Sequence, residues 1–301
     1  MMAAQKDKPD WQGELLLNES MARHTSWRVG GPAQRFYRPL DLQDLSAYLG
    51  QCPQDEPLLW LGLGSNLLVR DAGLTGSVIA MQGVIADIEL CDKNMLRAGA
   101  GASCARVARM AARHGLVGAE FLAGIPGTMG GALAMNAGAF GGETWQIVAN
   151  VTSINRRGEI SVRQPQEYRI AYRQVQGVAD EWFVGAYLRL QAGDAEAGQQ
   201  RIKTLLAQRN TSQPIGLPSC GSVFRNPPGD YAARLIEAAG LKGFTVGRAQ
   251  ISDKHANFII NTGDATAADI EKLIKHAQAE VQQQFDVHLQ TEVHIVGESG
   301  L

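Results

Sequence analysis

The chain has 301 residues, of which 45% are hydrophobic and 19% are charged. This length exceeds what a single hydrophobic core normally supports, so we expect at least two domains, folded throughout. With 28 Lys and Arg against 30 Asp and Glu, the formal net charge is −2. A protein with this balance lacks the excess positive charge that would attract nucleic acids or membrane surfaces. We therefore expect neither as a partner, and no protein partner is evident.

The cysteines indicate the compartment and argue against a metal site. Cys52, Cys91, Cys104 and Cys220 are widely spaced, with no Cys-x-x-Cys pair and no neighbouring His cluster. The first residues are polar, and no apolar run reaches the roughly 18 residues of a membrane span. We expect a reduced, cytoplasmic protein without a disulfide framework or a bound metal.

Local patterns in the first third predict two helices and a series of strands. Asp41 can cap a short helix in which Leu42, Leu45 and Leu49 recur at helical spacing, with Gly50 as its end. Ser103 is expected to cap a second helix, running to residue 114 and ended by a glycine. Strands are predicted at 58–61, 67–69, 77–81, 87–91 and 95–100, the last two forming a hairpin.

The segment from Gly124 to Gly142 reads GIPGTMGGALAMNAGAFGG. It contains too many glycines for an ordinary helix or strand interior. We predict a long loop of small residues, against which a flat ligand can lie.

The rest of the chain divides at a proline-rich break. Strands are predicted at 151–155, 170–174 and 182–190, followed by a helix over 193–213. Pro214 and Pro218 interrupt the helical pattern, and the main domain boundary is placed there. Beyond it we predict helices at about 231–239 and 266–285 and a closing strand at 287–296. The second of these helices starts with Thr266 three residues before Asp269, as in a capping box.

A shorter glycine motif, Gly62-Leu63-Gly64-Ser65-Asn66, lies between two predicted strands. Glycines at such a turn can present successive N–H groups to a phosphate. Gly and Asn are also the default residues of purely structural turns. The motif does not open a helix as a dinucleotide fingerprint does, and no Walker lysine accompanies it.

Longer strings resemble the UDP-N-acetylenolpyruvoylglucosamine reductase family. GLGSNLLVRD (62–71) and FLAGIPGTMGGALAMNAGAFGGE (121–143) resemble its two FAD-binding loops. HTSWRVGGPA, YRIAYR, LPSCGSVFRNP, SDKHANFIIN and QTEVHIVGE agree in the same order, from about residue 18 to 298. The absence of an insertion after Arg173 resembles the shorter of the family's two forms, while Cys220 and Arg248 depart from its pattern.

The resemblance implies an α+β fold, with a two-part FAD-binding domain of the vanillyl-alcohol-oxidase type followed by an α+β substrate-binding domain. We assign residues 1–17 to a polar extension and 214–301 to the substrate domain. Residues 18–213 form the FAD-binding domain, with lobes at about 18–100 and 101–192 and a connecting helix. Because 62–71 contains neither His nor Cys, FAD is expected to be held non-covalently.

The implied enzyme is a flavoprotein oxidoreductase of peptidoglycan synthesis that uses NADPH as co-substrate. It would reduce UDP-N-acetylglucosamine enolpyruvate to UDP-N-acetylmuramate, with hydride passing from NADPH to FAD and then to the enolpyruvyl group. An FAD-dependent oxidase of the same fold and a non-catalytic nucleotide-binding module are alternatives. The presence of Arg173, Ser222 and Glu292 together favours the reductase.

The resemblance assigns FAD binding to the two glycine loops. The residues concerned are Gly62, Gly64, Ser65, Asn66, Leu67, Gly124, Ile125, Pro126, Gly127, Thr128, Gly130, Gly131, Asn136, Ala137 and Gly138.

Three residues are implied to be catalytic, and each also has an ordinary structural interpretation. Ser222 would protonate a carbon after hydride transfer, whereas a serine after a glycine is commonly a turn or capping residue. Arg173, predicted in a strand on the face of Arg169, would stabilise the developing enol together with Glu292. Charged residues in strands also commonly lie on solvated faces, and Glu292 is predicted on the face opposite Val293.

Other residues have less specific assignments. By resemblance, Tyr172, Arg225 and Asn226 would contact the substrate. His255 and Asn257 fit either substrate binding or structural hydrogen bonding. His24 and Arg28 could help to hold the flavin. Cys220 is interpreted as a small apolar filler, with a reactive thiol as the alternative.

Overall fold

The computed structural model describes residues 10–298, and its contacts divide them into two units. Unit 1 contains the described residues up to Leu16, Phe36–Gly62 and Ser77–Gly198. Unit 2 contains Leu17–Arg35, Leu63–Gly76 and the chain from Gln199 onward. The division differs from the contiguous domains drawn from the sequence, because two N-terminal segments group with the C-terminal part. Of the predicted polar extension, residues 1–9 lie outside the described part.

A five-stranded antiparallel sheet forms the centre of unit 1. Its strands, in spatial order, are β12 (Ile160–Arg163), β11 (Val148–Asn155), β15 (Glu181–Arg189), β7 (Met95–Gly99) and β6 (Ile88–Asp92). The hairpin of β6 and β7 is as the sequence predicts. β12 is absent from the prediction, because its residues alternate between exposed and half-buried and give a weak apolar pattern.

A second sheet has the order β1-β2-β5-β3. Its strands are β1 (Glu14–Ser20), β2 (Pro32–Arg38), β5 (Leu74–Ala80) and β3 (Leu58–Leu61). Helix α1 (Leu42–Gln51) buries Leu45, Tyr48 and Leu49 in a cluster with β5. The predicted cap is confirmed, since the Asp41 side chain accepts a hydrogen bond from the Asp44 N–H. The predicted end is wrong, because the helix continues through Gly50.

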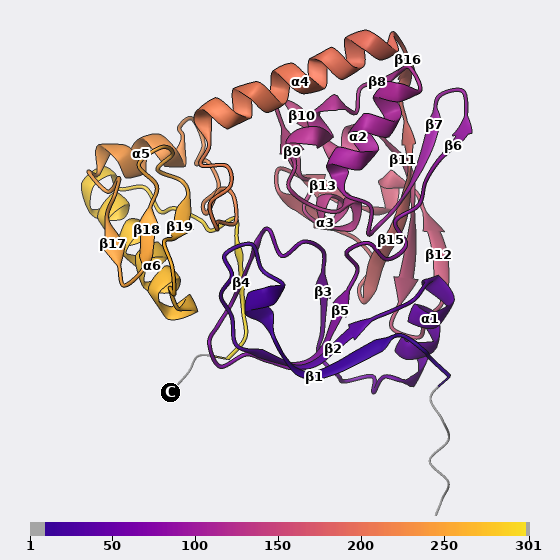
Figure 1. Ribbon diagram of the computed structural model, residues 1–301, viewed down its shortest axis with the longest axis horizontal. Coiled ribbons are helices and arrows are strands. Elements are labelled where there is room, and N and C mark those ends of the chain that lie inside the picture. The colour runs from indigo at the N-terminus through magenta and orange to yellow at the C-terminus, as the bar shows by residue number, and fades with distance from the viewer. Residues whose placement is uncertain (1–9, 299–301) are drawn as a thin grey trace, which may run out of the picture. The chain divides into compact units, whose positions relative to one another are not determined.

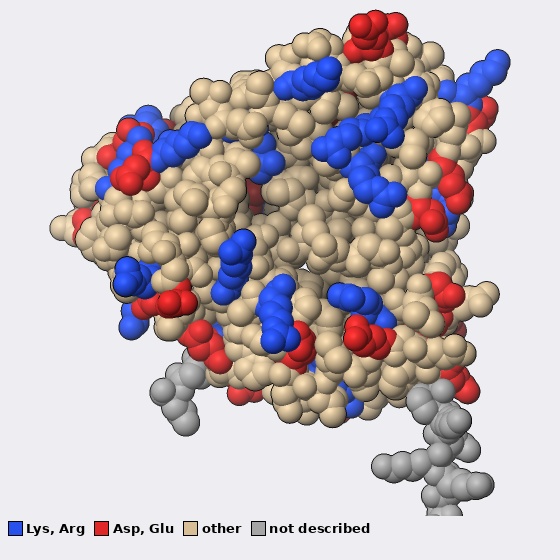
Figure 2. All heavy atoms as spheres, in the orientation of Figure 1, with Lys and Arg blue, Asp and Glu red and all other residues tan. Residues whose placement is uncertain are grey.

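Helix α2 (Cys104–Arg113) is strongly amphipathic, with the predicted Ser103 cap confirmed. Val107, Ala108 and Ala111 are buried, and Arg106, Arg109 and Arg113 are exposed. Figure 2 shows Lys and Arg side chains gathered over this helix.

The prediction of one long loop for the glycine-rich segment is wrong. It contains helix α3 (Met129–Ala134) and the paired strands β9 (Gly138–Ala139) and β10 (Gly142–Glu143). Thr128 caps α3, and the Met129 and Gly130 N–H groups donate to carbonyls of Ala102 and Ala100. These tertiary hydrogen bonds hold a helix that glycine content alone disfavours.

The segment predicted as a strand at 170–174 is instead a short hairpin. β13 (Arg169–Ala171) pairs antiparallel with β14 (Gln174–Gln176). Tyr172 and Arg173 form its turn, and Arg173 has a φ of 54°. The placement of Arg173 in a strand is therefore wrong.

Unit 1 also contains a pair of short strands and several 3-10 helices. β8 (Leu116–Val117) pairs with β16 (Gln191–Ala192). Short 3-10 helices lie at η2 (Glu120–Gly124), η3 (Thr144–Gln146) and η4 (Pro165–Glu167), and unit 2 contains η1 (Met21–Arg23).

Unit 2 packs helices against small sheets. Its elements are β4 (Leu67–Val69), α5 (Ala232–Ala238), β17 (Thr245–Val246), β18 (Ala249–Ile251), β19 (Ile259–Asn261), α6 (Ala267–Phe285) and β20 (His294–Val296). Figure 1 shows α5 and α6 beside the sheet of β17, β18 and β19. β4 and β20 pair in parallel. Helix α4 (Ala195–Ser212) lies within the predicted range 193–213.

Helix α6 supplies much of the core of unit 2. Ile270, Leu273 and Ile274 are buried on one face, and the predicted capping box of Thr266 and Asp269 is confirmed. The closing strand is shorter than predicted, because regular pairing covers only β20. Glu292 therefore lies just before a strand, although Leu289 and Val293 are buried as the alternation indicates.

Candidate functional site

In the first glycine loop, the backbone at Gly62 and Gly64 lies so close to neighbouring residues that a side chain at either position would overlap them. A Cβ on Gly62 would lie 2.6 Å from Thr128 Oγ1, so this residue touches the start of the second glycine loop in unit 1. Gly64 has a φ of 59°, and a Cβ there would overlap the His24 carbonyl oxygen. Glycine is therefore required at both positions. Ser65, half-buried, follows directly.

A pocket of about 290 Å³ opens beside this contact in unit 1. Gly62, Thr128, Gly130 and Gly131 of the two predicted FAD loops line it, together with aromatic side chains. Trp60 and Trp182 stack there, with ring centroids 5.2 Å apart and planes 17° apart. The Trp60 Nε1 atom is buried, with no hydrogen-bond partner in the described part of the chain. A flat, polar ring system fits this lining.

Neither tryptophan is among the site residues predicted from the sequence. The one available signal is position, since Trp60 lies two residues before Gly62. Trp182 lies far along the chain, in β15 of the five-stranded sheet, whereas Trp60 lies in β3 of the second sheet, so tertiary packing and not strand pairing brings the two rings together.

The second glycine loop also holds the Arg173 turn. The Asn136 amide nitrogen donates to Glu143 Oε2 at 2.9 Å and to the Ala171 carbonyl at 3.2 Å. Arg173 donates from Nη1 to the Asn136 carbonyl at 3.4 Å and from Nη2 to the Gly138 carbonyl at 3.0 Å. The guanidinium is thus oriented by the backbone of the loop.

The hydrogen bonds of the Asn136 side chain are made to other residues of the protein. Its Oδ1 accepts from the Trp145 N–H at 3.1 Å, and the residue is buried with a φ of 45°. This geometry favours a positioning role over direct cofactor contact. Tyr172 is exposed, and its ring lies 5.1 Å from the Arg173 guanidinium carbon.

The other predicted residues of this loop surround the same turns. Gly124 and Ala137 are buried, Ile125 and Gly127 are half-buried, and Pro126 is exposed. The Gly127 carbonyl accepts from the Cys104 N–H at the start of α2.

In unit 2, the segment of Ser222 runs antiparallel to that of Glu292. Phe224 and Thr291 form a β-bridge, and the Glu292 N–H donates to the Val223 carbonyl at 2.7 Å. The Arg225 N–H donates to the Gln290 carbonyl at 2.9 Å. This backbone pairing places Glu292 against Val223, the residue that follows Ser222.

The first glycine loop reaches the same segment through Asn66. Its amide nitrogen donates to the Glu292 carbonyl at 3.1 Å, and its own carbonyl accepts from the His294 N–H at 3.1 Å. Leu67 then begins β4, which pairs with β20. Within unit 2 the structure thus joins Asn66, from a predicted FAD loop, to the predicted catalytic Glu292.

Arg225 gives this region a positive charge. Its Nε is buried, and nothing in residues 10–298 accepts a hydrogen bond from it. An anionic ligand group would satisfy that donor. Burial, and secondarily the Arg225 charge, lowers the pKa of His294, which favours its neutral form.

Asn226 and Asn257 have structural partners. Asn226 Oδ1 accepts from the Ala232 N–H at the start of α5, at 3.1 Å. Asn257 pairs twice with Phe224, accepting from its N–H at 2.9 Å and donating to its carbonyl at 2.8 Å. Asn257 thus fixes the backbone two residues from Ser222.

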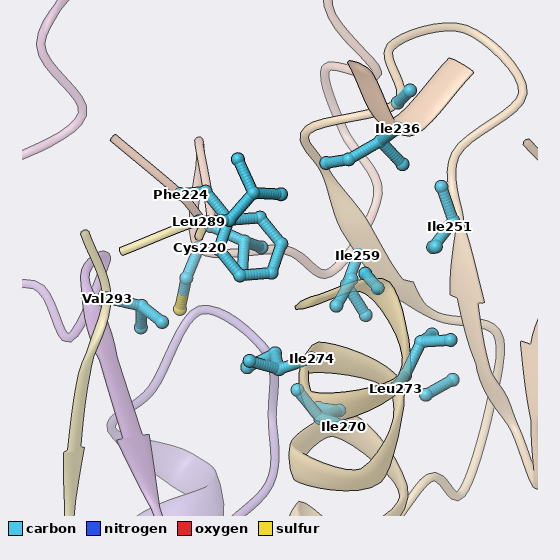
Figure 3. Packing of buried hydrophobic residues seen from close by; sticks show 14 of the residues in the cluster. Cys220, Phe224, Ile236, Ile251, Ile259, Ile270, Leu273, Ile274, Leu289 and Val293 are labelled. Carbon is cyan, nitrogen blue, oxygen red and sulfur yellow. The ribbon is translucent and has the colours of Figure 1, made fainter. Parts of the chain in front are cut away.

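Cys220 is a core residue. It lies in the cluster of Phe224, Leu289 and Val293 (Figure 3), with Sγ 3.5 Å from the Gly64 and Leu67 carbonyl oxygens. Burial raises the pKa of the thiol to about 12. A protonated, buried thiol agrees with the filler interpretation and not with a reactive one.

The remainder of GLGSNLLVRD anchors helix α6. Asp71 accepts hydrogen bonds from the Ala267 and Ala268 N–H groups, at 3.0 and 2.9 Å. Arg70 pairs with Glu271 at 2.9 Å and lowers the pKa of that carboxyl to about 2. The end of this motif is therefore structural.

The candidate residues fall into two groups. Ser222, Arg225, Glu292 and Asn66 belong to unit 2, and Arg173, Tyr172 and the second glycine loop belong to unit 1. Among the described residues, no three His, Cys, Asp or Glu side chains are placed to hold a metal ion. Within the same residues, no helix is long and apolar enough to cross a membrane.

Two family descriptions match the chain. Residues 33–162 match the FAD binding domain, and residues 213–296 match the C-terminal domain of UDP-N-acetylenolpyruvoylglucosamine reductase. A protein of that name from Alkalilimnicola ehrlichii is 60% identical over 299 residues, covering 99% of each chain. One from Legionella pneumophila is 57% identical over 291 residues, covering 96% of this chain and 94% of the relative.

A solved structure agrees with these sequences. The UDP-N-acetylenolpyruvylglucosamine reductase of Thermus caldophilus superimposes with a TM-score of 0.80 at 33% identity, covering 94% of this chain and 98% of that one. The predicted fold class, α+β with a vanillyl-alcohol-oxidase-type FAD-binding domain and a C-terminal domain, is confirmed.

Proposed function

Because the chain belongs to the UDP-N-acetylenolpyruvoylglucosamine reductase family of FAD-containing oxidoreductases, we propose that it reduces UDP-N-acetylglucosamine enolpyruvate to UDP-N-acetylmuramate, with NADPH as the hydride source. The reaction belongs to peptidoglycan precursor synthesis. We place it in the cytoplasm, where nucleotide sugars and NADPH are found.

The two glycine loops would hold the FAD without a covalent bond. Gly62 and Gly64 leave the backbone of the first loop open, while Thr128, Gly130 and Gly131 line the adjoining pocket. When bound, FAD supplies the redox chemistry by exchanging hydride with NADPH and then with the enolpyruvyl double bond.

Ser222 would supply the proton. Addition of hydride to the terminal carbon of the enolpyruvyl group leaves negative charge on the adjacent carbon and its carboxylate. The Ser222 hydroxyl would protonate that carbon, and solvent would reprotonate the serine. The paired backbone of 222–225 and 290–292 supports this role, because it fixes where the hydroxyl starts.

Three charged residues would interact with the charges of the intermediate and the substrate: Arg173, Glu292 and Arg225. The Arg173 guanidinium, held by two loop carbonyls, and Glu292 would stabilise the enol-like intermediate. The buried Nε of Arg225 would bind a carboxylate or phosphate of the substrate, with Tyr172 and Asn226 as further contacts.

One observation carries the proposal. In unit 2, Asn66 of the first glycine loop bonds to the Glu292 carbonyl, and the Glu292 N–H bonds to Val223 beside Ser222. A phosphate-binding loop attached directly to a proton donor and a carboxylate suits a flavin reductase better than a non-catalytic nucleotide module.

The test separates the two half-reactions under anaerobic conditions. The purified protein is mixed with NADPH and then with UDP-N-acetylglucosamine enolpyruvate, and the visible flavin absorbance is followed by stopped flow. We expect Ser222→Ala to be bleached by NADPH at the wild-type rate and to be reoxidised by the substrate at least 1,000-fold more slowly, about 4 kcal/mol in barrier.

The control is Ser212→Ala, which removes a hydroxyl bonded within α4 and should leave both steps unchanged. Equal loss of both half-reactions in Ser222→Ala would contradict the role of the serine. A flavin that oxygen reoxidises rapidly and the enolpyruvyl substrate does not would indicate an oxidase of the same fold.

A further inference from the structure

Unit 1 contains a second cavity, with a volume of about 570 Å³. It opens at the end of the five-stranded sheet where the hairpin of β6 and β7 turns (Figure 1). The described residues that line it include neither glycine loop and none of Arg173, Ser222 and Glu292. The proposed function therefore gives this cavity no role.

The register of three strands places two opposite charges in one row of this cavity. Met95 of β7 pairs with Asp92 of β6 on one side and with Arg189 of β15 on the other, and all three residues line the cavity. Directly paired residues of antiparallel strands point to the same face of the sheet. Neighbouring strands lie about 4.8 Å apart, so about 10 Å separates the Cα atoms of the two charged residues, with Met95 between them.

Neither charge is paired with an opposite one. Within residues 10–298, no ion pair joins Asp92 to Arg189, or either of them to another residue. Asp92 Oδ1 accepts a hydrogen bond from the Lys93 N–H at 2.6 Å, which leaves the carboxylate charge uncompensated. A ligand with one positive and one negative end would pair both charges at once.

Two irregularities of the sheet shape the cavity. The pairing of β6 with β7 shifts register between Leu90 and Asp92, and the pairing of β11 with β15 shifts between Val148 and Asn150. A β-bulge bends its strand and re-aims nearby side chains, and bulges are frequent next to active sites. Here one shift directly precedes Asp92, and the residue at the other, Ala149, lines the cavity. The cavity is therefore built by the strands of the sheet and is not a gap between loops.

We propose that this cavity binds a short peptide, with the terminal carboxylate at Arg189 and the terminal ammonium at Asp92. The separation of these charges across Met95 favours a ligand whose own charged ends are separated. An extended dipeptide spans about 7 Å, whereas a free α-amino acid carries both charges on one carbon atom. Recognition of peptide termini would be an additional property of the protein, independent of the proposed reduction.

The test titrates the full-length holoprotein with L-alanyl-L-alanine at pH 6.5, where the α-amino group of the peptide is protonated. The methyl signal of Met95, observed by NMR with isotope-labelled methionine and assigned with Met95→Leu, reports binding at the cavity itself. The N-acetyl derivative of the dipeptide lacks the positive end, and the C-terminal amide lacks the negative end. Free L-alanine tests the spacing of the charges.

We expect the dipeptide to bind saturably, at least fivefold more tightly than either derivative or alanine. Arg189→Gln and Asp92→Asn should each weaken dipeptide binding about fivefold, because each removes one solvent-exposed charge pair. Arg189→Gln should leave the affinity for the amide unchanged, and Asp92→Asn should leave that for the N-acetyl derivative unchanged. The matched control is Lys93→Gln, which removes a charge from the same hairpin outside the cavity lining and should bind like the wild type.

The absence of a saturable shift of the Met95 methyl signal with the dipeptide would overturn the inference. Equal affinity for the dipeptide and its two derivatives would exclude pairing with Asp92 and Arg189. Alanine binding as tightly as the dipeptide would exclude a peptide as the ligand, and equal weakening by Lys93→Gln would exclude a specific role of the two charges. The ligand series on the wild type needs no variant to fold. None of these measurements requires turnover, so they fail or succeed separately from the proposed function.

Discussion

Two buried asparagines hold the two segments that carry the proposed catalytic residues, and they do so differently. In unit 2, Asn257 pairs with both backbone groups of Phe224, near Ser222. In unit 1, Asn136 joins Trp145, Ala171 and the charged Glu143, near Arg173. Asn136 also has a φ of 45°, a conformation that asparagine tolerates better than most residues.

The two segments differ in how far each depends on its asparagine. The Ser222 segment has a second support, because its backbone also pairs with 290–292. The Arg173 turn belongs to a hairpin of two three-residue strands and relies on side chains to position it. We therefore expect unit 1 to lose its catalytic geometry more easily than unit 2.

Among substitutions of the two supporting asparagines, the largest loss of stability is expected for Asn136→Asp, which disrupts the Asn136 hydrogen bonds in unit 1. The new carboxylate would face Glu143 and could no longer donate to the Ala171 carbonyl. Unfolding free energy should fall by about 3 kcal/mol at pH 7.5, measured by thermal or urea denaturation. Reoxidation by the enolpyruvyl substrate should slow at least tenfold.

The pH dependence of Asn136→Asp checks the cause. Repulsion and burial raise the folded-state pKa of the new carboxyl above its unfolded value of about 3.9. The loss of stability should be full above that raised pKa and should shrink as the pH falls toward 3.9. Adding Glu143→Gln removes the like charge, so the double variant should recover part of the loss. A pH-independent loss would show that repulsion is not responsible.

A smaller effect is expected for Asn257→Ala in unit 2. It removes two buried hydrogen bonds to Phe224 and should cost about 2 kcal/mol. Substrate-dependent reoxidation should slow less than in Asn136→Asp, and reduction by NADPH should be unchanged.

The matched control for Asn257→Ala is Asn261→Ala. Asn261 is also buried in unit 2 and bonds to the Trp27 carbonyl and the Gly263 N–H. It should lose similar stability with no change in either half-reaction. Equal slowing in both variants would mean that Asn257 acts only through global stability, which would remove the basis of the comparison.

The smallest effect is expected at the ion pair of Arg70 and Glu271, which anchors helix α6 in unit 2 away from Ser222. The Arg70 guanidinium lowers the pKa of Glu271 to about 2. A lowered folded-state pKa stabilises the fold above the unfolded value of about 4.3, and this contribution disappears as the pH falls toward 2. Glu271→Gln should therefore cost about 1 kcal/mol at pH 7 and almost nothing near pH 2. A difference that persists in acid would exclude the ion pair as its source.

Features with local causes could be predicted from the sequence. The caps at Asp41, Ser103 and Thr266 depend on residues three positions apart, and the hairpin of β6 and β7 on adjacent strands. The resemblance supplied the fold class and the candidate residues, because its strings are long and occur in order.

Features with distant causes could not be predicted. Helix α3 forms in a glycine-rich segment because Ala100 and Ala102 accept its first N–H groups. The turn at Arg173 needs Asn136, 37 positions earlier in the chain, to hold it. The tryptophan pocket needs β3 and β15 in one unit, which no spacing reveals.

The parallel pairing of β4 with β20 has a consequence for the order in which the protein is made. β4 follows the first glycine loop, and its partner lies more than two hundred residues later, as do the partners of Asn66 and Trp27 at Glu292 and Ile259. Contacts at such separation form late, because most of the chain must be ordered between them. Synthesis must therefore reach residue 296 before this loop gains all of its native neighbours in unit 2, and any ligand that needs the finished loop must bind after that point.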